Sequence, residues 1–200
     1  GSKKPLIADK SFKGMGVDVL KCAFSSMDVN LTIHVLPWSR AQNSVKSQQY
    51  DGFFAASKQS SRDSFATMTI PIAEQKWTWY LLAETKLTPT QQGFKSQNMV
   101  ASFNGANMQS WLQNNNYQVA ANSQTTKELY KMLKIKRLDA ILPNNLVMDE
   151  IIQLDPKKVP LQSFVLRNKP LGVYFHNAFL KKFPGLMAEL NSAITHCRGH

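Results

Sequence analysis

The sequence predicts an α/β fold built from two sets of strands and helices. Strand-like apolar runs alternate along the chain with segments whose apolar residues recur every three to four positions. A polar stretch at residues 85–97, which contains Pro89 and Gly93, separates the first set from the second. With 200 residues, of which 43% are apolar and 18% charged, the chain is long enough to bury a core in one or two lobes.

The first set contains two predicted helices and three predicted strands. Apolar residues at helical spacing predict a helix over 17–27. Alternation of apolar and polar residues predicts a strand over 31–36, which Pro37 ends. A short polar helix over 39–49 follows. The other two strands are predicted at 51–57 and at 76–84, and the last of them is rich in aromatic residues.

The second set repeats this alternation. Its predicted strands are 99–103, 117–121, 138–145, 163–168 and 171–176. The predicted helices are 108–115, 123–137, 146–154 and a closing helix over 183–197. Because strands alternate with helices, we expect largely parallel sheets.

The chain is strongly basic. Lys and Arg outnumber Asp and Glu by 24 to 13, for a net charge of +11. This charge favours nucleic acid, an anionic membrane surface or acidic solutes as partners. We interpret the densest basic stretch, residues 127–137, as a solvated helix face, because no stripe of aromatic residues and no recognition motif accompanies it. The sequence therefore predicts no nucleic-acid partner.

Two cysteines, Cys22 and Cys197, lie far apart in the sequence and fit no metal-binding or C-x-x-C spacing. His196 beside Cys197 leaves a thiol catalyst as a weak alternative. The remaining alternatives are two free thiols or one disulfide between the first and the last helix. We favour the disulfide, which implies an oxidising compartment. We expect no metal and no cofactor.

Four stretches of the chain carry a family resemblance. They read PWSRAQNSVKSQQYDGFFAASKQSSRDSFATMTIPI, MVASFNGANMQSWL, KELYKMLKIKRLDAILPNN and LGVYFHNAFLKKFPGLMAELNSAI. In this order they resemble the periplasmic solute-binding proteins of the amino-acid type, the bacterial extracellular solute-binding protein family 3. The resemblance implies a two-lobed, type II periplasmic-binding-protein-like fold with a two-stranded hinge. Lobe 1 would be residues 1–84 plus 170–200, and lobe 2 residues 85–169.

The start of the chain departs from the family pattern. Family members usually open with a strand before the equivalent of residues 4–16, and almost nothing precedes Lys4. The resemblance therefore implies a first strand that is absent or trimmed. A sheet without that strand would leave backbone groups unpaired.

The first stretch contains small residues followed by a single arginine. Ala55, Ala56 and Ser57 match positions where the family presents backbone and hydroxyl groups to its ligand, and Arg62 matches the arginine that holds the ligand carboxylate. A guanidinium suits this role because its planar fork bonds both carboxylate oxygens and stays charged. The alternative is a surface arginine paired with Asp63 or with a helix end.

The second stretch contains a glycine turn at the start of a predicted helix. Asn104, Gly105, Ala106 and Asn107 match the ligand-contacting turn of the family. Free backbone N–H groups at a helix start bind anions. The alternative is an ordinary capped turn.

Asn144 is a second departure from the family pattern. It stands where amino-acid binders of the family carry an acidic residue for the ligand ammonium. Asparagine offers hydrogen bonds but no compensating charge, so a plain α-amino acid would be held less well. We expect the nearby Asp139 to be structural.

Tryptophans are further candidates for ligand contact, because an aromatic face can stack on a flat or cationic group. Trp77 and Trp79 point to the same side of their predicted strand, and at least one of them is expected to line the cleft. Trp38 follows a proline at the end of another predicted strand. Trp111 is assigned to the core.

The resemblance implies an extracytoplasmic, periplasmic domain that closes around a small polar, anionic or amino-acid-like ligand. It would act as the substrate-binding protein of an ABC transporter, with a membrane permease as partner. The alternative is the ligand-sensing domain of a membrane-bound signalling protein, such as a cyclic-dinucleotide or kinase receptor, connected to its own transmembrane region. A monomer and a dimer both fit, and a partner-binding domain with a vestigial cleft is a further alternative.

A cleft enzyme such as a dehydratase would need an acid or a base at the ligand. The candidates Glu74, His34 and His176 lack an evident constellation of partners in the sequence. We therefore expect no enzymatic activity and no catalytic residue.

Overall fold

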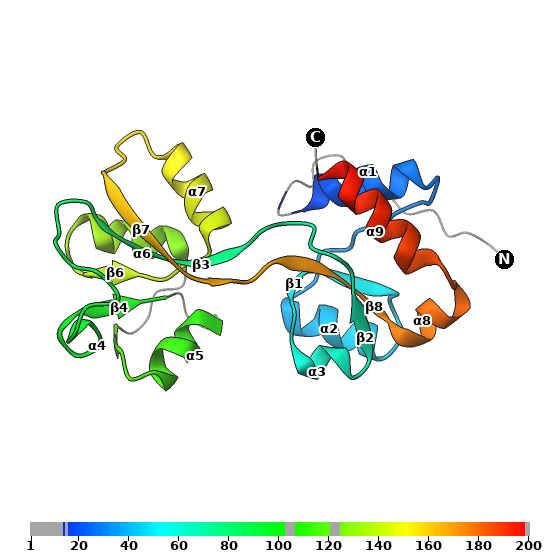
Figure 1. Cartoon of the computed structure of the whole chain (residues 1–200), viewed down its shortest axis with the longest axis horizontal. Coiled ribbons are helices and arrows are strands. Elements are labelled where there is room, and N and C mark those ends of the chain that lie inside the picture. Colours follow the sequence, from blue (N-terminus) through cyan, green and yellow to red (C-terminus); the bar gives the residue numbers. More distant parts are fainter. Residues whose placement is uncertain (1–13, 15, 103–106, 121–124, 199–200) are drawn as a thin grey trace. The chain divides into compact units, whose positions relative to one another are not determined.

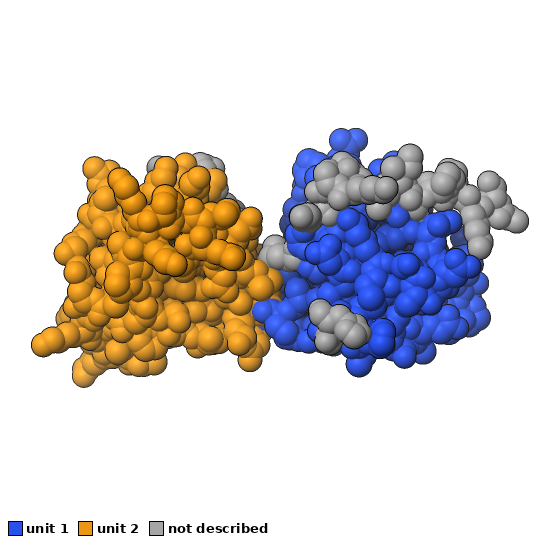
Figure 2. Space-filling model, turned by 90° about the horizontal axis from the view of Figure 1, so that it is seen from above, with its two compact units in different colours: residues 1–74, 169–200 blue, residues 75–168 orange. Residues whose placement is uncertain are grey.

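The computed structural model describes residues 14, 16–102, 107–120 and 125–198. The chain forms two compact units, which Figures 1 and 2 show. Unit 1 comprises Gly1–Glu74 with Lys169–His200, and unit 2 comprises Gln75–Asn168. The first boundary falls ten residues before the predicted one, because the strand that follows it pairs within unit 2.

Unit 1 contains one antiparallel sheet with helices on both faces. Its strands are β1 (Gly52–Ser57), β2 (Ala66–Met68) and β8 (Leu171–His176), in the order β1-β8-β2. Its helices are α1 (Val17–Ser26), α2 (Trp38–Lys46), α3 (Ser60–Asp63), α8 (Asn177–Lys182) and α9 (Leu186–Cys197). The central strand, β8, thus comes from the C-terminal part of the chain.

The core of unit 1 follows from the two-residue period of β8. Val173 and Phe175 point to the face that α1 and α9 cover, where they pack in one cluster with Leu20 and Leu190. Tyr174 points to the opposite face and packs with Phe53 and Val45, on the side of α2 and α3 (Figure 1). Both faces of this sheet are therefore buried.

The predicted disulfide is confirmed. Cys22 on α1 is bonded to Cys197 on α9, with the two Cα atoms 5.9 Å apart. The bond joins the first and the last helix of unit 1 across a sequence separation of 175 residues. The whole of unit 2 lies within the loop that this bond closes.

Unit 2 contains a mixed sheet in the order β5-β4-β6-β3-β7. Its strands are β3 (Lys76–Leu82), β4 (Met99–Ala101), β5 (Gln118–Val119), β6 (Ala140–Ile141) and β7 (Leu161–Asn168). Its helices are α4 (Phe94–Gln97), α5 (Asn107–Asn114), α6 (Thr126–Lys134) and α7 (Asn145–Leu154). Strand β4 runs parallel to β5 and β6, whereas β3 runs antiparallel to β6 and β7.

Strand β3 organises the core of unit 2. Trp77 and Trp79 pack on one face with residues of α4 and α5, such as Phe94 and Leu112. Tyr80 packs on the other face, with residues of α6 and α7. The two tryptophans share a face of the strand as predicted, but this face is covered by helices.

The mixed α/β composition is confirmed, while two details of the prediction are wrong. Residues 31–36 form no strand, because no backbone hydrogen bond joins residues 30–36 to any other described residue. An alternating pattern becomes a strand only where a neighbouring strand accepts its hydrogen bonds. The sheets are also not largely parallel, since β4 with β5 and β4 with β6 are the only parallel pairs of strands among the described residues. Within the same residues, no strand precedes β1, which lies at a sheet edge.

Candidate functional site

Strand β1 ends in an irregular backbone that redirects the chain toward α3. Phe54 pairs with Val173 and Ala56 pairs with Gly172, so that Ala55 between them is left out of the ladder. Ala55 has a φ of 59°, in the left-handed region that alanine seldom adopts. Such a conformation costs roughly 1–2 kcal/mol, and bulges of this kind often lie next to binding sites.

Arg62, on α3, lies beneath the surface with 5% of its area exposed. Its Nε donates to Oε1 of Gln42 at 2.9 Å, and its Nη1 donates to the carbonyl oxygen of Ser57 at 2.6 Å. The end of β1 and helix α2 therefore hold the guanidinium in one orientation. The arginine that the sequence singled out is buried, and it is not a solvated surface residue.

The charge of Arg62 has no carboxylate partner within the described part of the chain. Burial lowers the pKa of the guanidinium below its ordinary value, and the nearby Tyr174 and Asp63 oppose this change. An arginine side chain nevertheless stays protonated at any working pH. A buried positive charge without a counter-ion favours an anion that can approach it.

Asp63 binds Tyr174 instead of pairing with Arg62. The Tyr174 hydroxyl donates to Oδ1 of Asp63 at 3.0 Å and accepts the backbone N–H of Gln59 at 3.1 Å. Burial raises the pKa of Tyr174, so this hydroxyl keeps its proton. These two bonds fix both ends of the four-residue helix α3 to the central strand, and they thereby position Arg62.

Trp38, the first residue of α2, covers one side of the guanidinium. The Cζ atom of Arg62 lies 5.2 Å from the centroid of the indole, and the indole packs nearly perpendicular to the ring of Phe53 at a centroid distance of 5.8 Å. Trp38 is 45% exposed. A tryptophan in this position stabilises the cation and leaves part of its ring surface available to a bound molecule.

The sequence analysis missed Gln42 and Tyr174 as members of this cluster. Gln42 lies four residues after Trp38, so both project from the same side of α2. That spacing was visible in the sequence. The role of Tyr174 could not be read from the sequence, because its hydrogen-bond partners lie 111 and 115 residues away.

In unit 2, the parallel strands β4 and β6 end at the same edge of the sheet. The Ser102 hydroxyl, just beyond β4, donates to the carbonyl oxygen of Leu142, just beyond β6, at 2.8 Å. Along the chain, α7 begins three residues after Leu142 and α5 begins five residues after Ser102. In α/β sheets, ligands bind beyond the carboxyl ends of such strands.

Asn144 lies at this edge as the N-cap of α7. Its Oδ1 accepts the backbone N–H of Val147 at 2.9 Å, and 8% of its area is exposed. The side-chain oxygen is therefore committed to the helix, and the amide group remains as a donor. Asp139 is structural as expected, because its Oδ2 accepts the backbone N–H of Met99 at 2.7 Å.

The remaining predicted residues fall into three groups. Asn107 is the exposed first residue of α5. Asn104, Gly105 and Ala106 lie outside the described residues. Trp77 and Trp79 are buried in the core of unit 2, so neither ring surface is free for a solute, and both are left out of the site proposed below.

The three candidate catalytic residues each have a structural role. Nδ1 of His176 accepts the backbone N–H of Ala178 and caps α8. Glu74 forms an ion pair with Arg198, and His34 packs its ring against Tyr50. Within the described residues, no group of three or more His, Cys, Asp or Glu side chains forms a metal site.

Comparison with solved structures identifies the fold. The similar structures include the probable amino-acid ABC transporter extracellular-binding protein ytmK from Bacillus subtilis, with a TM-score of 0.73, 15% identity and coverage of 100% of this chain and 89% of that chain. A GluR0 ligand-binding core in complex with L-glutamate has a TM-score of 0.72, 16% identity and coverage of 96% and 86%. Arginine-bound, truncated ArgBP from T. maritima has a TM-score of 0.66, 15% identity and coverage of 92% and 85%.

No family model and no curated protein matched the chain. At identities near 15%, the structural similarity establishes the fold alone. The chain has the type II periplasmic-binding-protein-like fold that amino-acid-binding proteins adopt. Among the described helices, none combines the length and the apolar character that a membrane span requires.

Proposed function

We propose that this chain is the extracytoplasmic solute-binding component of an amino-acid-type ABC transporter, and that Arg62 binds a carboxylate of its solute. One observation carries the proposal: a buried guanidinium, held by two hydrogen bonds, forms no salt bridge with a carboxylate among the described residues. Charge-assisted hydrogen bonds to such a group contribute about 1.5–3 kcal/mol each. The function is binding, and no chemical step is required.

Unit 1 supplies the anion-binding part of the site. Five donors belong to the guanidinium, and the described part of the chain uses two of them, at Nε and Nη1. The remaining donors include both N–H groups of Nη2, which suit a carboxylate oxygen. Trp38 and Ser57 contact this group. With the bulged Ala55 and the buried Ala56 of the same strand end, they complete the proposed contacts of unit 1.

The candidate solute contacts in unit 2 are polar and carry no negative charge. We assign this role to Asn107 and to the amide of Asn144, and the family resemblance adds Asn104, Gly105 and Ala106. Two of the similar structures contain a bound α-amino acid, glutamate in one and arginine in the other. Because Asn144 cannot neutralise an ammonium group, the proposed solute is a carboxylate in which the α-ammonium contributes little to binding.

A thermal-shift series with paired solutes tests this proposal. L-glutamate and glutarate have the same two carboxylates and differ by the ammonium group. We expect the best-binding solutes to be carboxylates, and glutarate to stabilise the protein at least as well as L-glutamate. A solute at one hundred times its dissociation constant stabilises the folded state by about 2.7 kcal/mol. Stabilisation by cationic or neutral solutes but by no carboxylate would contradict the assignment.

Location outside the cytoplasm agrees with the disulfide, because such bonds persist in oxidising compartments. A membrane permease is the partner that the proposed function requires. Reconstitution of transport with the permease encoded beside this chain tests that partner directly. Uptake of the solute that is independent of this protein would contradict the transporter assignment.

A further inference from the structure

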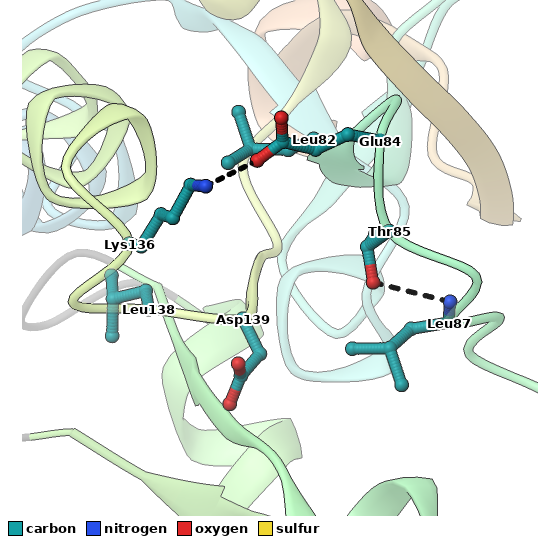
Figure 3. Close-up of a pocket in the computed structure, with 7 residues that line it drawn as sticks. All are labelled: Leu82, Glu84, Thr85, Leu87, Lys136, Leu138 and Asp139. Carbon is teal, nitrogen blue, oxygen red and sulfur yellow. Dashed lines mark hydrogen bonds and ion pairs between the residues drawn. The ribbon is translucent and has the colours of Figure 1, made fainter.

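Unit 2 has a groove on its surface that the proposed solute site does not use. It is lined by Leu82, Glu84, Thr85, Leu87, Lys136, Leu138 and Asp139, as Figure 3 shows. Its volume of about 290 Å³ is at the low end of the range of about 300–1,000 Å³ that small-molecule pockets occupy. The groove thus suits a protruding side chain better than a complete cofactor.

The wall of this groove is held in place by hydrogen bonds. Nε2 of Gln162 donates to the carbonyl oxygens of Thr85 at 3.0 Å and of Leu87 at 3.2 Å. The backbone N–H of Leu87 also donates to the Thr85 hydroxyl at 3.2 Å (Figure 3). The loop after β3 is therefore ordered before any partner arrives, which lowers the entropic cost of binding.

Two exposed aliphatic side chains lie at the neighbouring helix ends. Ile135 follows α6 and is 61% exposed, and Leu154 ends α7 and is 73% exposed. Nζ of Lys134 connects the two helix ends, because it binds Oδ2 of Asp155 at 2.6 Å and the carbonyl oxygen of Lys157 at 2.7 Å. Single exposed aliphatic residues are ordinary, but two of them at joined helix ends, with Ile135 next to the groove residue Lys136, suggest a contact surface.

The same region has an excess of positive charge. Two of its lysines are paired, Lys134 with Asp155 and Lys136 with Glu84, both at 2.6 Å. Its other basic side chains are exposed, and none forms a salt bridge within the described part of the chain. These side chains are Lys131, Arg137, Lys157 and Lys158.

We propose that the α6–α7 end, defined as residues 131–137, residues 154–158 and the adjoining groove, binds an acidic segment of a partner protein. An aliphatic side chain of that segment enters the groove between Leu82, Leu87 and Leu138. Carboxylates on either side of it meet the unpaired lysines and Arg137. The positive surface attracts such a segment from a distance and orients it.

This occupant fits the surface better than nucleic acid or lipid does. The described residues that line the groove include no aromatic side chain on which a base could stack. A membrane surface is flat and offers nothing that fills a groove, whereas a peptide presents side chains one at a time. The proposal concerns a surface of unit 2 and does not depend on Arg62.

Fluorescence anisotropy with the full chain tests the proposal. The probe is a short fluorescein-labelled peptide in which glutamates flank a single leucine. We expect saturable binding that weakens as the ionic strength rises from about 0.01 M to about 0.15 M, because the Debye length falls from about 30 Å to about 8 Å. Replacement of the leucine by glycine is expected to weaken binding several-fold.

A matched pair of variants separates this surface from general electrostatic attraction. K157E/K158E reverses two exposed charges at the α6–α7 end, and K181E/K182E makes the same change on the exposed lysine pair of α8 in unit 1. We expect the first variant to bind the peptide about tenfold more weakly, from two lost exposed ion pairs and added repulsion, and the second to bind it within about twofold of the original chain.

Three results would overturn the proposal. They are absence of saturable peptide binding, equal losses in the two variants, and equal binding of the leucine and the glycine peptides. Vesicles of phosphatidylcholine with and without phosphatidylglycerol complete the test. The protein could sediment with the anionic vesicles but bind no peptide. If K157E/K158E then abolished the sedimentation, this surface would be assigned to a membrane instead.

Discussion

Replacement of Arg62 by methionine separates the two roles of this residue. Methionine keeps an unbranched apolar side chain in place of the aliphatic stem of arginine and removes the charge and all five donors. In the folded protein, the change deletes the bonds to Gln42 and to the Ser57 carbonyl. In the complex, it also deletes the proposed contact with the solute carboxylate.

The two effects differ in size. Loss of two charge-assisted hydrogen bonds destabilises the fold by about 3–6 kcal/mol, and removal of a buried charge that forms no salt bridge with a described residue offsets several kcal/mol of desolvation. We therefore expect the free energy of unfolding without solute to change by less than about 2 kcal/mol. Truncation of one member of a buried charge pair costs about 2–5 kcal/mol of binding, which corresponds to an affinity that is about 30-fold to several thousand-fold weaker.

Titration calorimetry gives the affinity, and urea denaturation without solute gives the stability. The solute is the best carboxylate from the thermal-shift series. The control is Arg40→Met, because Arg40 is exposed on α2 and takes no part in the described contacts of Arg62 with Gln42, Ser57 and Trp38. We expect the control to bind the solute within about threefold of the original chain. Unchanged affinity in Arg62→Met, or equal losses in both variants, would refute the assignment of Arg62.

Three further predictions concern the folded state. Cys22→Ser with Cys197→Ser is expected to lower the free energy of unfolding by about 2–5 kcal/mol, because the bond closes a loop of 175 residues; an unchanged midpoint in guanidinium chloride would contradict this. Trp79→Ala should destabilise the protein by about 3–5 kcal/mol, since the indole is buried in unit 2. Trp38→Ala should instead mainly weaken solute binding. Denaturation measures the loss of stability in each variant, and calorimetry measures the loss of affinity. Burial raises the pKa of Tyr80 above its ordinary value of 10.0, with Asp149 adding to the effect. The stability from this neutral hydroxyl is complete below pH 10 and falls at higher pH, because the tyrosine of the unfolded state ionises first. Tyr80→Phe should therefore reduce the fall of the melting temperature at alkaline pH. An unaltered dependence of the melting temperature on pH would contradict the burial of this hydroxyl.

The sequence predicted the elements with strong periodicity. The helix over 17–27 and the strands over 51–57 and 76–84 appear close to the predicted positions as α1, β1 and β3. Apolar spacing is a local property, so it can be read without knowledge of neighbours. The predicted strand at 31–36 failed for the opposite reason, because a strand exists only when another strand pairs with it.

The tryptophans of β3 show a similar limit of prediction from the sequence. The alternation in β3 correctly placed Trp77 and Trp79 on one face. Alternation cannot tell which of the two faces a helix will cover. Here α4 and α5 cover the tryptophan face, so residues that were predicted to line a cleft are core residues.

The sequence by itself determined the α/β class, the disulfide candidate and the position of Arg62 after a strand of small residues. Only the tertiary structure decided that Arg62 is buried and forms no salt bridge with a described carboxylate, and that Gln42, Trp38 and Tyr174 surround it. The physical reason is distance along the chain: helical and strand periods depend on neighbours in sequence, whereas desolvation and hydrogen-bond partners depend on segments that meet after folding.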